Sequence, residues 1–449
     1  MTQSTSLEFN DIQGFAVRGF GKMPYAGYLM VTIKAPTKCK HWLKQQLEDN
    51  IITPATQREA TGGARRALAF CASGMKKLLG DAWMPNTFPS EFIEGMVQEH
   101  RSRLLGDTYS NAPNHWRWGK DNKIDAVVLC FAENQAAVTS QLDELSAEDN
   151  GMVEVTRIFA HVPSDHKEPF GFADGVSQPI IQGTDRNKAV AAKNPRDHNL
   201  HAVPAGEIIL GYADGTGELP RSPAVSPAGH GTEWLQPHFE QNELKDLGRN
   251  GTFMVVRQLA QDVALFEDYI EKNGGEALAA KMVGRNKDGT PLLTDRFAKH
   301  DNDFDFLEDL EGKACPIGSH VRRTNPRSTV HEATAQGSLE VTNRHRILRR
   351  GRVYKNDDGE VGLLFVCLNA CINRQFEFVQ STWANNPFFQ GLAAEVDPLI
   401  GTQCPAAESF TMPAEPYRQK VTGLKQWVTV KGGAYFFMPS LTALRVLAQ

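Results

Sequence analysis

One carboxylate, Asp174, stands close to two glycines in the segment Glu168-Pro-Phe-Gly-Phe-Ala-Asp-Gly-Val-Ser-Gln-Pro179. Glycines at 171 and 175 allow the backbone to turn sharply while it presents an acid. A carboxylate presented in this way can accept a proton from a substrate and later return it, as a general base and then a general acid. The alternative interpretation is a tight turn in which the aspartate only caps its own backbone.

A histidine, His320, precedes the most basic part of the chain. From Val321 to Arg352 there are eight arginines and two acids, a local charge of +6 in a chain whose net charge is −5. Guanidinium groups suit carboxylates and phosphates. A haem, with one axial histidine and two propionates, fits this combination. A nucleotide fits the charge alone, but no glycine-rich phosphate loop accompanies it. The Cys-Pro dipeptides at 315 and 404 offer rival thiolate ligands to iron.

A third segment combines Arg349 and Arg350 with the apolar run Gly362–Cys367. Leu363 and Phe365 alternate within that run, so a strand would direct both side chains to the same space. An arginine next to such a strand is either a salt-bridged surface group or a cation held against that space.

Four units of an apolar strand followed by an amphipathic helix position these segments. Their strand and helix ranges are 28–33 with 36–48, 126–131 with 135–145, 252–256 with 260–272, and 362–367 with 372–383. Two units fall in each half, which predicts a duplicated α+β fold made of antiparallel sheets with helices on one face. The segment from 184 to 250, rich in Gly, Pro, Asn and His, would bridge the halves. We therefore predict domains at 1–200 and 201–449.

The composition excludes several classes of protein. Over 449 residues, 41% are hydrophobic and 22% charged, and the net charge of −5 argues against a nucleic-acid or anionic-membrane partner. No apolar run approaches the roughly 20 residues that cross a bilayer. The first residues carry no signal-peptide pattern, and the seven cysteines form no Cys-x-x-Cys pair. We expect a cytoplasmic location.

In these segments the chain resembles the dye-decolorising peroxidase family, especially its longer members. Five motifs in the family's order carry the resemblance, which runs from residue 11 to about 440: Asp11-Ile-Gln-Gly14, Gly171-Phe-Ala-Asp-Gly175 with Ser177-Gln-Pro179, Gly318-Ser-His-Val-Arg-Arg-Thr-Asn-Pro-Arg327, Leu348-Arg-Arg-Gly351 with Gly362-Leu-Leu-Phe-Val-Cys367, and Asp397-Pro-Leu-Ile-Gly401.

The resemblance implies a haem b in the C-terminal half of two ferredoxin-like halves. It implies His320 as the proximal iron ligand, with Asp397 holding its other nitrogen, and Asp174 with Arg349 as the distal pair that activates peroxide. Arg350 is the neighbouring alternative to Arg349. The cofactor contacts expected besides these are Gly175, Arg322, Arg327, Leu363 and Phe365, the last two at the peroxide entrance.

The expected function is reduction of hydrogen peroxide with one-electron oxidation of small or bulky aromatic donors, including dyes. Bulky donors would need an electron route through an oxidisable side chain, for which Trp383 and Tyr354 are the candidates. The alternative is a haem carrier or sensor that uses the same pocket without turnover, and a third reading is an α+β protein whose arginines bind a phosphorylated ligand. Assembly into a homo-oligomer is left open.

Overall fold

A computed structural model describes residues 6–56, 65–121, 123–293, 297–330, 334–404 and 408–449. Its main sheet has nine strands in the order β10-β12-β11-β4-β1-β3-β2-β15-β9. These strands are β1 (Tyr25–Ile33), β2 (Arg65–Phe70), β3 (Ala126–Ala132), β4 (Met152–His161), β9 (Thr252–Gln261), β10 (Leu348–Arg349), β11 (Arg352–Lys355), β12 (Val361–Asn369) and β15 (Val428–Met438).

Each half of the chain supplies four neighbouring strands in the same internal order. The first half supplies β4-β1-β3-β2, and the second half supplies β15-β9-β12-β11. When the strands of each half are numbered in chain order, both half-sheets have the strand order 4-1-3-2. This is the order of a ferredoxin-like β-α-β-β-α-β unit. The predicted duplication into two antiparallel halves is therefore confirmed.

The two half-sheets close on each other. Strand β4 pairs with β11 through His161 and Val353, β2 pairs with β15 through Phe70 and Phe437, and β9 pairs with β12. The strands therefore form a closed ring, and β10 pairs with the same edge of β12 as β11, in the same register. A core of aromatic and aliphatic side chains, among them Tyr28, Phe131 and Phe436, fills the ring.

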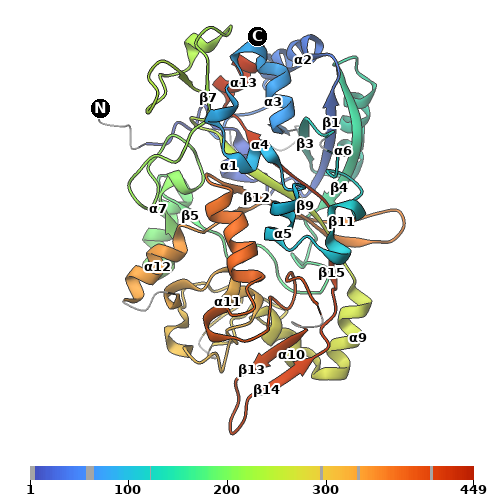
Figure 1. The fold of residues 1–449 in the computed structure, drawn as a ribbon, viewed down its shortest axis with the longest axis vertical. Coiled ribbons are helices and arrows are strands. Elements are labelled where there is room, and N and C mark those ends of the chain that lie inside the picture. The colour runs from blue at the N-terminus through green and yellow to red at the C-terminus, as the bar shows by residue number, and fades with distance from the viewer. Residues whose placement is uncertain (1–5, 57–64, 122, 294–296, 331–333, 405–407) are drawn as a thin grey trace.

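Helices cover the outer faces of both halves. They include α2 (Pro36–Glu48), α3 (Ala72–Leu79), α6 (Gln135–Ala147), α9 (Val263–Asn273), α10 (Gly275–Val283) and α13 (Leu441–Leu447). In Figure 1, α2, α3 and α13 lie at one end of the molecule, and α9, α10 and the β13–β14 hairpin (Ser409–Met412, Gln419–Thr422) at the other. Because strands such as β3 face the ring core on one side and helices on the other, all seven of its residues are buried.

Helix α6 shows how close this packing is. The side chain of Asn134 accepts a hydrogen bond from the Ala137 N–H and so caps the helix. A Cβ added at Gly27 of β1 would lie only 2.7 Å from side-chain atoms of Val138 and Leu142. The amphipathic spacing in the sequence thus predicted the buried face of α6.

The fourth predicted helix differs from the others in its winding. It consists of two π-helical segments, η9 (Asn373–Glu377) and η10 (Val379–Ala384). Its wide turns are visible in the hydrogen bonds from Glu377 N–H to Ile372 O and from Asn385 N–H to Gln380 O, which span five residues. Apolar periodicity alone could not distinguish this winding from an α-helix.

The connection between the halves runs from residue 162 to 251. It contains α7 (Asp185–Lys193), α8 (Pro195–His201) and the short strands β5 (Ile180–Ile181), β6 (Ala202–Val203), β7 (Ala224–Val225) and β8 (Lys245–Asp246). The predicted domain boundary between residues 200 and 201 falls inside this connection and stays a prediction. The remaining α-helices are α1 (Gly14–Arg18), α4 (Ser90–Glu94), α5 (Glu99–Leu105), α11 (His320–Thr324) and α12 (Ala335–Asn343). Among the described residues, no helix is long and apolar enough to cross a bilayer.

Candidate active site

Two adjoining cavities of about 160 and 140 Å³ lie between α11, β10 and β12. Ser177, His320, Val321, Arg349 and Ile400 line both of them. Three segments far apart in the sequence therefore meet here: the loop that follows β4, the start of α11 and the strand β10. The loop lies before residue 200, so both predicted domains contribute to the wall.

His320 begins α11, and its imidazole is oriented by a buried carboxylate. The Nδ1 atom lies 2.9 Å from Asp397 Oδ2, and Oδ1 of Asp397 accepts the backbone N–H groups of Leu399 and Ile400. Burial raises the pKa of Asp397, but attraction to His320 and these hydrogen bonds outweigh it, so the pKa lies below its usual value. An ionised Asp397 favours the proton on Nδ1 and leaves Nε2 with a free lone pair. No described residue hydrogen-bonds Nε2.

Asp174 sits on a tight turn, as the glycine spacing predicted. Gly171 and Gly175 have φ angles of 88° and 72°, a region that residues with a side chain rarely adopt. The Gly175 N–H donates to Asp174 Oδ1 at 2.6 Å. Asp174 therefore caps its own backbone turn, as the alternative interpretation expected. It also lines the larger cavity together with Gly175, so the turn presents the acid as well.

The carboxylate of Glu168 holds this turn and was not singled out in the sequence. It accepts the backbone N–H groups of Phe170 at 3.0 Å and Phe172 at 2.9 Å, and the Gln261 amide at 2.6 Å. Burial raises the pKa of Glu168 despite these hydrogen bonds. An acid at the head of the glycine-containing motif was the available signal, because a carboxylate is well suited to bind the free amides of such a turn.

Arg349 approaches Asp174 from β10. Its Nη1 lies 3.8 Å from Asp174 Oδ1, while Nη2 donates to the Ser177 carbonyl at 3.1 Å. Arg350, the alternative, points elsewhere: its Nη2 donates to the Val17 carbonyl, and its side chain lines a different cavity. The alternation of a strand explains why these two neighbours face opposite sides.

Leu363 and Phe365 alternate along β12 and line the two cavities separately. Leu363 lines the larger one, and Phe365 the smaller, where its ring lies 6.1 Å from that of Phe376. The two side chains therefore line neighbouring cavities, and the prediction that both face one space stays a prediction.

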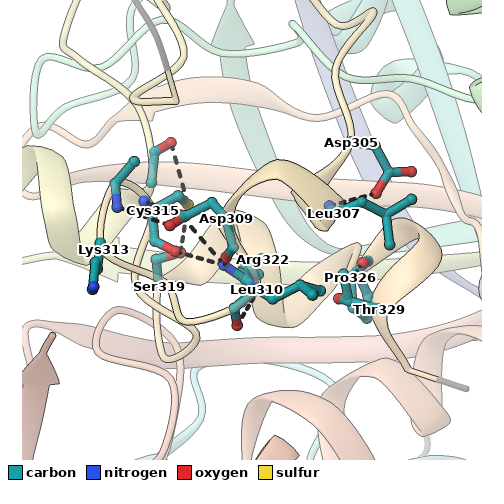
Figure 2. A network of polar contacts seen from close by, with 12 residues as sticks. Asp305, Leu307, Asp309, Leu310, Lys313, Cys315, Ser319, Arg322, Pro326 and Thr329 are labelled. Carbon is teal, nitrogen blue, oxygen red and sulfur yellow. Dashed lines mark hydrogen bonds and ion pairs between the residues drawn. The ribbon is translucent and has the colours of Figure 1, made fainter. Parts of the chain in front are cut away.

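Arg322 lies outside both cavities, in a network that holds the preceding loop together (Figure 2). It donates to the carbonyl groups of Asp309, at 2.8 Å, and Cys315, at 2.9 Å, and stacks 4.7 Å from the centre of the Phe306 ring. The structure therefore gives Arg322 a role in holding the loop rather than a contact with a cofactor in these cavities.

Arg327, by contrast, belongs to a group of buried arginines beside the cavities. Its Nε and Nη2 atoms are buried without a hydrogen-bond partner. Burial, together with Arg285 and Arg346, holds the pKa of Arg327 well below its ordinary value. Arg285 lines the larger cavity and Arg346 the smaller. Asp197, Asp301 and Asp305 offset part of this charge, but no described carboxylate forms an ion pair with the three arginines. Buried cations without an ion pair suit an anionic ligand.

Sequence reasoning found Arg327 and counted Arg346 among the eight arginines, but missed Arg285. That residue lies 35 positions before His320, outside the basic segment, and nothing in its local pattern marks it.

The remaining candidates lie away from the cavity walls. Trp383 is buried against His345, with 5.2 Å between ring centres, and His345 lines the smaller cavity. Tyr354 is buried in the ring core and donates to Glu360 at 3.0 Å. Cys315 contacts Ser319, and burial raises the pKa of its thiol. Cys404 is absent from the described walls of both cavities, and Pro405 lies outside the described residues.

The comparisons with known proteins all point to one kind of enzyme. The family model Dyp-type peroxidase, C-terminal, matches residues 208–390. Multifunctional dye peroxidase DyP2 of Amycolatopsis sp. is 29% identical over 75% of this chain and 74% of its own. A dye-decolorizing peroxidase of Exidia glandulosa is 26% identical over 98% of this chain and 87% of its own. A solved dye-decolorizing peroxidase in complex with 2,6-dimethoxyphenol is 25% identical, with a TM-score of 0.75 over 99% of this chain and all of that one.

The fold and these relatives define a haem-dependent peroxidase. Over nearly its whole length the chain is similar to dye-decolorising peroxidases. The residues present suit that cofactor, because the cavities hold an oriented histidine with a free nitrogen beside buried arginines that lack anions.

Proposed function

We propose that the protein reduces hydrogen peroxide and oxidises aromatic donors by single electrons, at a haem b held in the two adjoining cavities. The Asp174–Arg349 pair carries this proposal, because it lines the same cavity as His320. A carrier of haem needs an axial ligand, but it has no use for a proton acceptor and a cation at the opposite wall.

His320 would ligate the iron through Nε2, while Asp397 accepts the hydrogen bond from Nδ1. A carboxylate partner makes the imidazole a stronger donor to the metal and fixes its ring orientation. The bound haem would supply the redox chemistry that the side chains lack.

Asp174 would take a proton from the incoming peroxide and return it to the oxygen that leaves as water. Arg349 would stabilise the negative charge that develops as the O–O bond breaks. The Ser177 carbonyl and the Gln178 amide fix Arg349, so little reorganisation would be needed during the reaction.

The propionates would be neutralised by Arg327 with Arg346, neither of which forms an ion pair with a described carboxylate. Gly175 would form part of the distal wall, since its missing side chain leaves the space beside Asp174 open. Leu363 and Phe365 would limit this space to small molecules such as peroxide.

The donors are proposed by chemical class. One relative is named a multifunctional dye peroxidase, and a solved relative binds 2,6-dimethoxyphenol. Small phenols would react near the haem. Bulky dyes would need an electron route, for which we propose Trp383, because its partner His345 lines the smaller cavity. Tyr354 is the second candidate, although it lies within the ring core.

Titration of the purified protein with haem, followed by peroxide and 2,6-dimethoxyphenol, tests this function. We expect a Soret absorbance band to appear at one haem per chain, and the phenol to be oxidised only when peroxide is present. A stable Soret band without any peroxide-dependent oxidation would instead identify a carrier or sensor.

A further inference from the structure

A third cavity, of about 720 Å³, lies on the other side of β10 from the proposed haem site. Its walls come from α1, β10, the N-terminal segment and the stretch from Pro179 to Arg186. Phe9, Ile181 and Leu348 give it apolar surfaces, and Arg18, Arg186 and Arg350 give it positive charge. This volume lies within the usual range for small-molecule sites.

None of the three arginines forms an ion pair with a described carboxylate, although Asp197 offsets part of the charge of Arg186. Arg18 donates to the Ala55 carbonyl and Arg350 to the carbonyls of Val17 and Arg349, all neutral acceptors. The Nε atom of Arg350 is buried without an acceptor. Arg186 has no hydrogen bond or ion pair to any residue in the described ranges.

Only one acid, Asp185, lines the cavity among the described residues, and it makes no ion pair within them. Lys22 also lies on the exposed rim. Burial and the nearby charge of Arg186 lower the pKa of Arg350 to about 10, which reflects the same excess of positive charge. Cations on apolar walls suit a ligand that has a flat hydrocarbon body and an anionic group.

The cavity is separated from the proposed site by one strand. Leu348 and Arg350 line it, whereas Arg349, the residue between them, lines the two adjoining cavities. Consecutive Cα atoms are about 3.8 Å apart, so an aromatic ring bound here would lie close to the distal wall.

We propose that this cavity binds an aromatic anion, a carboxylate or a sulfonate, and that it is the binding site for anionic reductants. The donor would give one electron to the peroxide-oxidised haem across β10 and leave the cavity as its one-electron-oxidised product. The second part rests on the proposed peroxidase function, whereas binding itself does not.

Calorimetric titration of the haem-loaded protein with naphthalene-2-sulfonate, a probe chosen for its anionic group, tests the binding. Naphthalene-2-sulfonamide is the neutral control of similar size. We expect the sulfonate to bind at one site per chain, more weakly as salt rises, and the sulfonamide to bind at least about tenfold more weakly. R18Q/R186Q should weaken sulfonate binding by about tenfold or more. R196Q is the matched control, because Arg196 is an exposed arginine of α8 away from the cavity.

A second experiment measures the oxidation of two donors, a sulfonated azo dye and the uncharged 2,6-dimethoxyphenol. In R18Q/R186Q we expect KM for the dye to rise by about tenfold, while the phenol's KM and the rate of reaction with peroxide stay unchanged.

Equal binding of sulfonate and sulfonamide, or wild-type affinity for the sulfonate in R18Q/R186Q, would overturn the proposed binding site. Loss of haem affinity in that variant would also overturn it, since the arginines would then serve the propionates. Failure of every donor to react would refute the peroxidase proposal and leave the binding result intact.

Discussion

At the scale of single residues, the imidazole of His320 has two nitrogens in different positions. Nδ1 faces an ionised Asp397, and Nε2 faces the cavities. The nearby thiol of Cys315 is the rival ligand, but it is buried, contacts Ser319 and has a raised pKa, so it stays protonated at neutral pH.

We expect His320→Ala to abolish tight haem binding, because its imidazole is oriented by Asp397 and lines both cavities. His345 lines only the smaller cavity, where its Nδ1 contacts the Arg374 carbonyl and its ring stacks on Phe378. Cys315→Ser, which keeps the size and polarity of the side chain, should bind haem like the wild type. Titration of both variants with haem, followed by Soret absorbance, makes the comparison. A normal spectrum for H320A together with a bleached C315S would reverse the ligand assignment.

Asp174→Asn should keep haem but react with peroxide about 10²–10⁴-fold more slowly, since asparagine cannot take up a proton. Stopped-flow mixing of the haem-loaded variant with peroxide measures this rate. Asp165→Asn is the control, because Asp165 is exposed and caps a nearby backbone N–H.

Arg349→Leu should slow the same step by about 10²–10³-fold, through loss of the charge that stabilises the breaking bond. The same stopped-flow measurement applies, and the Soret band reports whether haem is still held. If both distal variants reacted at the wild-type rate, the acid–base role would belong to another group. His161 and His166 are absent from the described walls of the two cavities, so neither is a ready substitute.

At this scale the sequence predicted which residue types gather at the site, but not where each side chain points. The arginine excess after His320 indicated an anion, but the count could not show which guanidinium faces it. Arg322 donates to local carbonyls and leaves one buried donor, Nε, without a partner. Arg327 donates from Nη1 to the Asn302 carbonyl and leaves two buried donors, Nε and Nη2, without partners. Glu168 binds the local N–H groups of Phe170 and Phe172, so its place at the head of the motif was a usable signal. Arg285 lies outside the basic segment, and no local spacing reveals it.

At the scale of elements, the π-helical segments η9 and η10 bring Trp383 near the smaller cavity. Its ring meets the rings of His345 and Phe378 nearly at right angles, with centres 5.2 and 5.3 Å away. Trp383 is 5% exposed, so a dye at the surface cannot touch it. It would therefore act as an inner step in an electron route.

We expect Trp383→Phe to slow oxidation of a bulky dye severalfold and to leave the peroxide step unchanged, because phenylalanine preserves packing but is much harder to oxidise. Steady-state rates with a dye and with 2,6-dimethoxyphenol, beside stopped-flow rates with peroxide, separate these effects. Phe378→Leu serves as a packing control in the same cluster. Dye oxidation at the wild-type rate in W383F would make Trp383 a packing residue only.

The four strand–helix units were predictable because each carries its own local signal. Strand β3 is apolar throughout, and α6 repeats its apolar residues at helical spacing. The closure of the ring was not predictable, since pairs such as Phe70 with Phe437 join residues more than 360 positions apart. The very short β10 gave no periodicity at all.

At the scale of the whole molecule, buried acids join the connection between the halves, residues 162–251, to the second half. Glu207 is fully buried and accepts hydrogen bonds from the Gly215 N–H and from Arg374, which also binds Asp214. Burial, opposed by Arg374, raises the pKa of Glu207 to about 7. The folded state therefore holds this proton more tightly than the unfolded chain does.

Because the folded pKa is the higher one, the stability from Glu207 is complete below pH 4.5 and is lost as pH rises through about 7. We expect this group to contribute at most about 3 kcal/mol. Glu207→Gln should flatten the dependence of unfolding free energy on pH in that window, as urea denaturation at pH 5 and pH 8 would show. Exposed Glu218→Gln should change nothing, and parallel curves for wild type and E207Q would refute the assignment.

The closed ring of strands has a consequence for how the chain is made. During synthesis the first four strands emerge with the edges of β2 and β4 unpaired, and exposed edges of this kind invite association with other chains. Their partners are β15 and β11, and β15 is the last strand to leave the ribosome. The edge of β4 thus stays unprotected until β11 has been made, and the edge of β2 until β15 has been made. Since Asp174, His320 and Asp397 lie far apart in the sequence, the proposed haem site can be completed only after Asp397 has been made.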